Sequence, residues 1–225
     1  LSLKILTALS FNSFINNKTI TIEGIKNIDQ IDINNANQLG YKIKLLGVAE
    51  SGKNKIIQRV HPALIKEKSY IATVGGVLNA VIIESSPVGK TVLQGEGAGP
   101  GPTTSSLISD LCSVLRGNVK FPFVLSNKKR KSMAFEKIDN KKFSVYLRLD
   151  VKDKHGILSD ITKVMATNKV SVKRLIQNPT ISKKNASIVI ITHEAKSSSY
   201  VKVLSTLKNK TYIVNKPKII RIEKV

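Results

Sequence analysis

Apolar and polar residues alternate along two long segments in the first part of the chain. The first is YKIKLLGVAES, residues 41–51, in which Lys42 and Lys44 separate apolar neighbours, and the second is NKIIQRVHPALI, residues 54–65. Alternation with a period of two predicts half-buried β-strands. The polar residues Ser51–Lys53 predict the turn of a hairpin between them.

A second strand pair is predicted in GVLNAVIIESS, residues 76–86, and GKTVLQGEG, residues 89–97, with a Pro- and Gly-containing turn between them. Asn79 interrupts the first of these strands, and we expect a buried amide that bonds to neighbouring backbone. Together with a short strand near residue 20, residues 19–94 predict an open, largely antiparallel sheet with one or two helices on one face.

Three segments instead carry apolar residues at the spacing of an amphipathic helix. They are Ser2–Phe11, residues 29–40 and residues 103–117. Gly40 and Gly117 are the C-terminal stop signals of the second and third segments. The Ser and Thr residues that open the third segment are its N-cap candidates.

The pattern restarts after residue 142, and residues 143–225 alternate strands with two helices. The predicted elements are strand 143–153, helix 156–169, strands 170–178 and 186–194, helix 198–210 and strand 217–225. The order βαββαβ predicts a ferredoxin-like unit. The fold class is therefore α+β, an open sheet with helices on one face followed by a ferredoxin-like domain.

The formal net charge of +22 suggests a nucleic-acid-binding protein at first sight. However, 31 of the 37 basic residues are lysine and only 6 are arginine, the residue that reads phosphate and guanine bidentately. Aromatic residues make up 5% of the chain and tryptophan is absent, whereas RNA recognition relies on aromatic stacking. We predict no nucleic-acid partner, and a basic RNA-binding protein is the least favoured hypothesis.

The basic residues concentrate in residues 126–142, SNKKRKSMAFEKIDNKK. This segment contains seven basic residues and two acidic ones, Glu136 and Asp139. A charged, weakly apolar run between two patterned regions is typical of a linker. We therefore predict a first domain over residues 1–120, a basic linker over 121–142 and a second domain over 143–225.

The single cysteine, Cys112, excludes an internal disulfide framework and is predicted to pack as a small buried hydrophobe. His61 and His193 are predicted at strand ends and His155 in a loop, and they share no metal-ligand spacing, so no metal site is expected. No apolar run is long enough to cross a membrane, and we expect a reducing, cytoplasmic compartment with no membrane partner. The chain opens on Leu1, and we expect a fragment of a longer protein.

The stretch GEGAGPGPTT, residues 95–104, holds four glycines and two prolines. It could cradle a phosphate, link two domains flexibly or turn the chain between them. The first alternative is weak because the stretch lacks the Lys-Ser/Thr ending of a P-loop.

A strand is predicted to run directly into a helix through Asp153–Gly156. The first-turn amides of Ile157 and Leu158 could receive a carboxylate there. The spacing alone favours the alternative, an ordinary strand–helix turn without a ligand. The segment resembles the opening of an ACT domain, an amino-acid-binding regulatory module, with His155 where that family usually has proline. The resemblance implies a regulatory ligand site at Asp153, His155, Gly156, Ile157 and Leu158, and side-by-side pairing in a homo-oligomer.

Four stretches of the first domain resemble homoserine dehydrogenase in order and spacing: LGYKIKLLGVAE, RVHPALI, VGGVLNAVIIES and GEGAGPGPTTSSLISDL. With the ACT domain behind them, the chain is similar to the C-terminal two-thirds of the bacterial form. This implies interconversion of aspartate 4-semialdehyde and homoserine by hydride transfer with NAD or NADP, in threonine, methionine and isoleucine biosynthesis. Threonine is the expected regulatory amino acid.

The resemblance further implies that Gly97, Ala98, Gly99 and Thr103 approach the nicotinamide end of the cofactor, whose binding domain would precede Leu1. The family's second catalytic lysine aligns with Ser2, so no catalytic residue is assigned. Lys4 lies about 200° around the helix and cannot replace it. The fragment alone is expected to be inactive, and Ser2 supports an alternative, a nonenzymatic amino-acid-sensing or interaction protein.

Overall fold

The computed structural model describes residues 2–14, 20–52, 55–118, 133–136, 138, 141–179 and 184–225. The chain forms two compact units. One contains residues 1–16, 67–133 and 225, and the other contains residues 17–66 and 134–224. Most of the predicted linker, namely residues 121–132, 137, 139 and 140, lies outside the described residues, as do residues 119 and 120.

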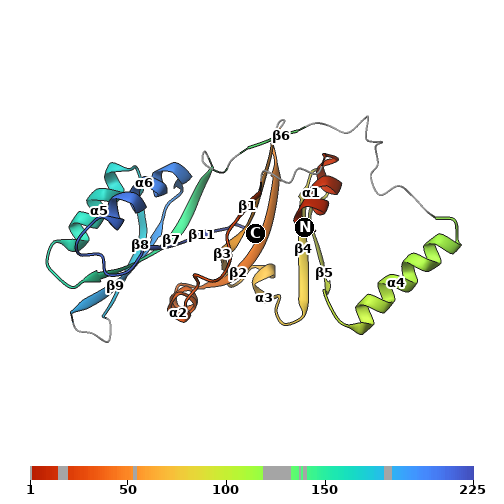
Figure 1. The fold of residues 1–225 in the computed structure, drawn as a ribbon, viewed down its shortest axis with the longest axis horizontal. Helices are drawn as coiled ribbons and strands as arrows, with labels where there is room; N and C mark the ends of the chain where they lie inside the picture. The colour runs from red at the N-terminus through yellow and green to blue at the C-terminus, as the bar shows by residue number, and fades with distance from the viewer. Residues whose placement is uncertain are drawn as a thin grey trace. The chain divides into compact units, whose positions relative to one another are not determined.

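The larger unit is built on one nine-stranded sheet (Figure 1). Its strands are β1 (Ile20–Ile22), β2 (Tyr41–Ser51), β3 (Lys55–Lys66), β6 (Ala134–Phe135), β7 (Lys142–Lys152), β8 (Val172–Pro179), β9 (Asn185–Thr192), β10 (Ala195–Lys196) and β11 (Lys218–Ile222). Its helices are α2 (Gln30–Gln38), α5 (Ile157–Thr167) and α6 (Ser197–Lys208).

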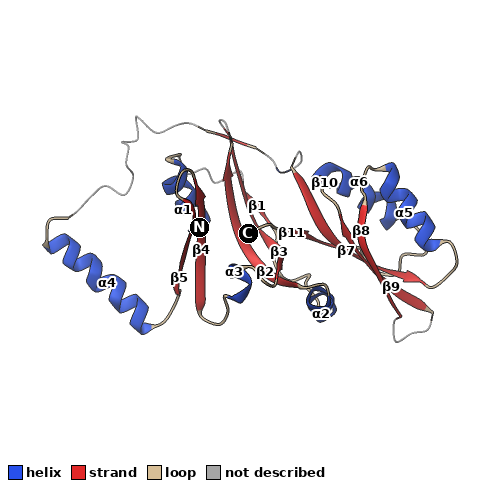
Figure 2. Ribbon diagram, turned by 180° about the vertical axis from the view of Figure 1, so that it is seen from behind, coloured by secondary structure: helices blue, strands red, loops and turns tan. Residues whose placement is uncertain are grey.

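The predicted βαββαβ unit is confirmed. Strands β11, β7, β9 and β8 lie side by side in that order and are antiparallel throughout. Helices α5 and α6 pack on one face of these strands, where Leu147, Leu149 and Ile190 are at most 1% exposed. Figure 2 shows both helices on the same side of β7, β8 and β9.

The ferredoxin-like strands continue directly into the sheet of the first half of the chain. One edge of β3 pairs with β2 in an antiparallel hairpin. The other edge is shared by three short parallel pairings, with β6 at Lys55–Ile56, with β1 at Gln58–Val60 and with β11 at Ala63–Leu64. Since β11 also pairs with β7, the two predicted domains share one sheet. Strand β6, which falls in the predicted linker, belongs to this sheet.

Helix α2 covers the face of the ferredoxin-like sheet opposite to α5 and α6. Alternate residues of a strand point to opposite faces, and Tyr146, Val189 and Ile220 pack with Ala36 and Leu39 of α2. The predicted ends of this helix are confirmed: Asp29 is the N-cap in a capping box with Asp32, and Gly40 follows with φ +78°.

The smaller unit holds α1 (Ser2–Phe11), α3 (Tyr70–Thr73), the hairpin β4 (Leu78–Ser85) and β5 (Gly89–Glu96), and α4 (Pro100–Leu115). The prediction of one sheet over residues 19–94 is wrong in part, because β4 and β5 form a separate two-stranded sheet. The short elements α3, β6 and β10 were not predicted, since two to four residues carry no readable period.

Helix α4 begins at Pro100, three residues before its predicted start. Gly99 is the N-cap and proline occupies the first helical position, which suits proline because the amide there lacks a partner in any helix. The Ser and Thr N-cap candidates are therefore wrong. Gly117, with φ +70°, ends the helix region as predicted.

Candidate functional site

The turn Gly97–Gly99 connects β5 to α4 and is held by the backbone. The amide of Gly97 donates to the carbonyl oxygen of Val77 at 3.1 Å. A Cβ on Gly97 would lie 1.7 Å from Nδ2 of Asn79, so the side chain of Asn79 already occupies that space. Gly99 has φ +126°, a conformation that favours glycine. The turn is therefore a defined structure, unlike a flexible linker.

Asn79 differs from its prediction in burial but not in its partner. Its side chain is exposed, and its Nδ2 donates to the carbonyl oxygen of Val77 at 3.4 Å. The requirement for glycine at position 97 thus has a cause within the chain. Thr103 lies in the first turn of α4, where its amide donates to the carbonyl oxygen of Gly99 at 3.2 Å.

Helix α4 has two properties of a surface that meets another part of a protein. Its N-terminus has no side-chain cap, and because Pro100 and Pro102 have no N–H group, Gly101 is the one residue among its first three that has an amide to donate to an anion. None of its side chains is buried, and its apolar residues are 49–77% exposed in the described part of the chain: Leu107, Ile108, Leu111, Val114 and Leu115. Cys112 is half-buried and is not the buried hydrophobe that was expected.

Ser2 is exposed at the first position of α1. The predicted helix is confirmed in its bounds, and its buried residues are Thr7 and Ala8. The apolar residues Ile5, Leu6 and Leu9 are 41–43% exposed. A seryl hydroxyl here cannot supply the positive charge of an ammonium group.

The predicted ligand loop, Asp153–Leu158, joins β7 to α5. Gly156 has φ +83° and precedes the first helical residue, and no side chain caps the helix. The first-turn amides of Ile157 and Leu158 therefore face no capping group. The side chain of Ile157 is 8% exposed and anchors the turn in the core, whereas Leu158 is 37% exposed and His155 is exposed. The structure thus brings the five predicted residues together on one strand–helix turn.

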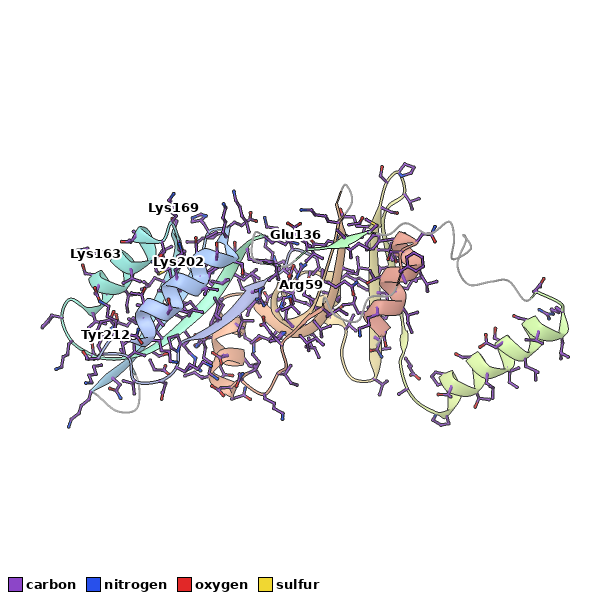
Figure 3. The ribbon with its side chains drawn as sticks, turned by 45° about the horizontal axis from the view of Figure 1, so that its top comes forward. Arg59, Glu136, Lys163, Lys169, Lys202 and Tyr212 are labelled. Atoms are coloured by element: carbon purple, nitrogen blue, oxygen red, sulfur yellow. The ribbon has the colours of Figure 1, made fainter. Side chains whose placement is uncertain are left out.

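Two residues beside this loop were not predicted. The hydroxyl of Tyr212, the residue labelled in Figure 3, donates to Oδ2 of Asp160 at 2.7 Å. Nζ of Lys210 lies 2.9 Å from the same oxygen. The hydrogen bond from Lys210, and then that from Tyr212, lower the pKa of the Asp160 carboxyl. Burial and the neighbouring carboxylate raise the pKa of the Tyr212 hydroxyl, which stays protonated. A carboxylate therefore lies in the first turn of α5 beside the helix amides.

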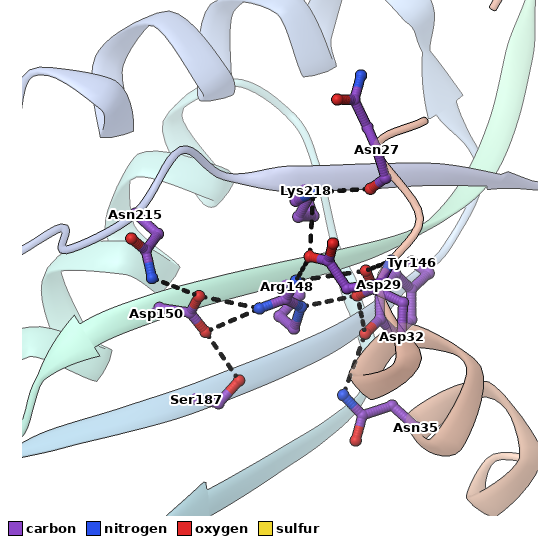
Figure 4. Close-up of polar contacts among 10 residues, drawn as sticks. All are labelled: Asn27, Asp29, Asp32, Asn35, Tyr146, Arg148, Asp150, Ser187, Asn215 and Lys218. Carbon is purple, nitrogen blue, oxygen red and sulfur yellow. Dashed lines mark hydrogen bonds and ion pairs between the residues drawn. The ribbon is translucent and has the colours of Figure 1, made fainter. Parts of the chain in front are cut away.

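A buried ionic cluster joins β7 to α2 (Figure 4). We call it the Arg148 cluster, and its members are Asp29, Asp32, Tyr146, Arg148 and Asp150. Nε of Arg148 donates to Oδ1 of Asp32 at 2.7 Å, and Nη1 donates to Oδ2 of Asp150 at 2.9 Å. The Tyr146 hydroxyl also donates to Asp32, at 2.9 Å, and receives Nδ2 of Asn35 at 3.2 Å. Asp32 is fully buried and Arg148 is 5% exposed.

The electrostatics of the Arg148 cluster follow from burial and pairing. Burial acts to lower the pKa of the Arg148 guanidinium, but the hydrogen bonds and charges of Asp32 and Asp150 outweigh it and raise that pKa. Burial also raises the pKa of the Tyr146 hydroxyl, so the group acts as a hydrogen-bond donor. At the exposed end, Lys218 and Arg148 lower the pKa of Asp29.

A second buried cluster joins β3 to the C-terminal end of β11. The carboxylate of Glu223 accepts Nε and Nη2 of Arg59, both at 2.9 Å, and lies 3.0 Å from Nε2 of His61. Burial alone would raise the pKa of Glu223, but the bonds from His61 and Arg59 lower it to about 2. Arg59 also donates to Glu50 at 2.7 Å, and Lys141 pairs with Glu50. Arg59 is labelled at this position in Figure 3.

The prediction that His61 lies at a strand end is wrong. It is fully buried within β3, and Nδ1 lies 3.0 Å from the carbonyl oxygen of Pro62. Among the described residues, no three His, Cys, Asp or Glu side chains lie close enough together to hold a metal ion. No helix in the described part of the chain is long and apolar enough to span a membrane.

Comparisons with known families match each half of the chain to a family model. Residues 2–112 match the family model of homoserine dehydrogenase, and residues 145–210 match that of the ACT domain. The homoserine dehydrogenase of Helicobacter pylori is 33% identical over 221 residues, which are 98% of this chain and 52% of the relative. That of Neisseria gonorrhoeae is 37% identical over 195 residues, 84% of this chain and 45% of the relative.

Solved structures of homoserine dehydrogenases are similar to this chain over nearly its whole length. A homoserine dehydrogenase from Thiobacillus denitrificans has a TM-score of 0.88 at 30% identity and covers 98% of this chain and 51% of its own. One from Staphylococcus aureus has a TM-score of 0.67 at 27% identity and covers 100% of this chain and 52% of its own. The chain thus spans about half the length of its relatives, not the two-thirds that was expected.

Proposed function

The chain belongs to the homoserine dehydrogenase family, and on this premise we propose that it supplies the substrate-side sheet and the amino-acid sensor of such an enzyme. The reaction is the interconversion of aspartate 4-semialdehyde and homoserine by hydride transfer with NAD or NADP. The observation that carries the proposal is the conjunction of the two matches, a homoserine dehydrogenase segment followed by an ACT domain in one chain.

The cofactor contact that we propose is the turn formed by Gly97, Ala98 and Gly99 with the start of α4. The uncapped N-terminus is the positive end of the helix dipole, which favours a nucleotide phosphate, and Gly101 is the one residue of its first three with an amide to donate. The exposed apolar side of α4 suits contact with a cofactor-binding domain. The side chain of Asn79 already explains why position 97 is glycine, without any contact with a cofactor. The support for a cofactor contact therefore comes mainly from Gly99 and the start of the helix.

The regulatory site that we propose is the loop Asp153–Leu158, with an amino acid, expected to be threonine, as ligand. Its carboxylate would accept the amides of Ile157 and Leu158. Calorimetry of the protein against L-threonine, L-isoleucine and L-methionine tests this. One of the three is expected to bind, and a Gly156→Val variant is expected to bind at least about 10-fold more weakly because a β-branched residue disfavours φ +83°. If none of the three amino acids binds, the proposed regulatory site is wrong.

We also propose a homo-oligomer in which the free edge of β8 meets a second copy. The other edge strand of the ferredoxin-like unit, β11, is already paired with β3 of the same chain. Strand β8 pairs only with β9 among the described residues, and an unpaired strand edge is a template for association. Light scattering should give a dimer or larger assembly, and a Leu175→Pro substitution in β8 should reduce its mass.

A nonenzymatic amino-acid-sensing protein is the second candidate, because Ser2 stands at the place of the family lysine. The two candidates differ in an assay of homoserine-dependent NAD or NADP reduction by the complete gene product. An enzyme produces aspartate 4-semialdehyde in step with reduced cofactor. A sensor binds its amino acid without turnover, and a Ser2→Lys substitution then restores activity only if the rest of the active site is intact.

A further inference from the structure

We propose that the ligand loop is coupled to α2 by a continuous set of hydrogen bonds that runs from Asp160 through residues 210–215 to the Arg148 cluster. The inference rests on the proposed regulatory role of the ACT domain. It states how the binding of an amino acid at the loop changes the conformation of the other half of the larger unit. Every step lies within that unit.

The first step links the start of α5 to the segment that precedes β11. Asp160 accepts the hydroxyl of Tyr212 at 2.7 Å and pairs with Lys210 at 2.9 Å. Asp160 lies two residues after Leu158, the last residue of the loop, and its own amide donates to Gly156 at 3.0 Å. A ligand that orders the first turn of α5 therefore acts directly on the position of Tyr212.

The second step fastens residues 210–215 along the end of β7. The amide of Lys152 donates to the carbonyl oxygen of Tyr212 at 2.9 Å, and the amide of Val214 donates to that of Asp150 at 2.8 Å. Ile213 forms an isolated antiparallel bridge with Val151. The segment thus follows β7 as a short additional strand, and it cannot shift without moving the backbone around Asp150.

The third step enters the Arg148 cluster through a side chain. Nδ2 of Asn215 donates to Oδ2 of Asp150 at 3.1 Å, and the same carboxylate accepts Nη1 of Arg148 and the hydroxyl of Ser187 (Figure 4). Asp150 is therefore shared between the 210–215 segment and the buried guanidinium. A change in the position of Asp150 therefore alters how the N–H groups of Arg148 are shared between Asp150 and Asp32.

The fourth step reaches α2. Arg148 holds Asp32 through Nε at 2.7 Å and Nη2 at 3.3 Å, and Asp32 is fully buried. A buried charge must keep its partner, because an unpaired one is strongly unfavourable. Asp32 and the helix that carries it therefore follow Arg148. Helix α2 leads through Gly40 directly into β2, the strand that pairs with β3 along its length.

The path joins two elements that the sequence separates by more than 100 residues, and it needs no contact with the smaller unit. It differs from a merely structural network in one respect. The end beside the ligand loop is the half-buried side chain of Tyr212, and the other end is a buried charge pair that cannot separate freely. The arrangement transmits a small local displacement as movement of α2.

Amide hydrogen exchange of the full chain tests the coupling in Tyr212→Phe, which removes only the hydroxyl. Without ligand, exchange in residues 30–39 of the variant is expected to rise by about 5-fold or more, the lower end of typical coupling between sites. With L-threonine, the wild type should show a change in the same residues, and the variant should bind threonine without showing it.

Tyr200→Phe is the matched control. It removes a more deeply buried hydroxyl from the same ACT domain, one that contacts Thr192, Phe143 and His193 and lies off the path. The coupling is overturned if the effect of Tyr212→Phe stays within residues 157–163 and 210–215, or if Tyr200→Phe affects α2 equally. If no amino acid binds the wild type, the sensor proposal fails, and the ligand-free comparison still decides the coupling.

Discussion

Asp32 and Arg148 are 116 positions apart in the chain, yet they form a buried hydrogen bond of 2.7 Å between α2 and β7. Asp32 comes from the segment that matches homoserine dehydrogenase, and Arg148 from the segment that matches the ACT domain. The pair therefore ties the ACT domain to the first half of the chain inside one sheet-based unit. Strand β11, which pairs with both β7 and β3, makes the same connection through the backbone.

Asp32→Ala should destabilise the larger unit severely. It leaves the guanidinium of Arg148 buried without its main partner, and breaking a buried ion pair by removing one partner costs about 3–5 kcal/mol. Denaturant unfolding measures the loss. The control is Glu194→Ala, which removes an exposed pair with Lys224 and should be indistinguishable from the wild type. Equal losses in the two variants would contradict the role of the Arg148 cluster.

The Glu223 carboxylate should make stability depend on acid. Its pKa is lowered to about 2 in the fold, whereas an unfolded glutamate titrates near 4.3. A lowered pKa contributes stability that is present above the unfolded pKa and is lost as pH falls through the folded value. The expected loss between about pH 5 and pH 2 is on the order of 3 kcal/mol. Unfolding curves of wild type and Glu223→Gln over this range should differ in slope.

Gly97 and Gly99, in the turn that we propose contacts the cofactor, should respond differently to substitution by alanine. Gly99→Ala places a side chain at φ +126°, and strain in such a backbone region costs on the order of 1–3 kcal/mol. Gly97→Ala instead meets the exposed side chain of Asn79. Adding Asn79→Ala should therefore restore the melting temperature of Gly97→Ala but leave that of Gly99→Ala unchanged. Rescue of both or of neither would show that the turn is held differently.

Much of the local structure followed from periodicity in the sequence. The bounds of α1, the Gly40 stop of α2 and the order of the ferredoxin-like unit were predicted because each depends on neighbouring residues. The start of α4 was missed because Pro100 and Gly99 were assigned to a loop. The single sheet over residues 19–94 was wrong because strand pairing is a nonlocal choice that alternation does not encode.

The buried clusters could not be predicted from the sequence either, because their members come together only through nonlocal contacts. Arg148 and Asp150 are charged residues in the second half of β7, on the face opposite to Leu147 and Leu149. That pattern signals a polar partner for the second face of the sheet but does not identify Asp32. The predicted loop residues came together because they are contiguous, whereas Tyr212 reaches Asp160 only through the tertiary fold.

The rate of homoserine oxidation as a function of L-threonine concentration tests the central claim, that the chain combines a homoserine dehydrogenase region with an amino-acid sensor. The complete gene product is assayed with homoserine and NAD or NADP. The account predicts turnover that falls saturably with threonine in the wild type and becomes several-fold less sensitive in Tyr212→Phe. Turnover that threonine, isoleucine and methionine all leave unchanged, or no turnover at all, would contradict it.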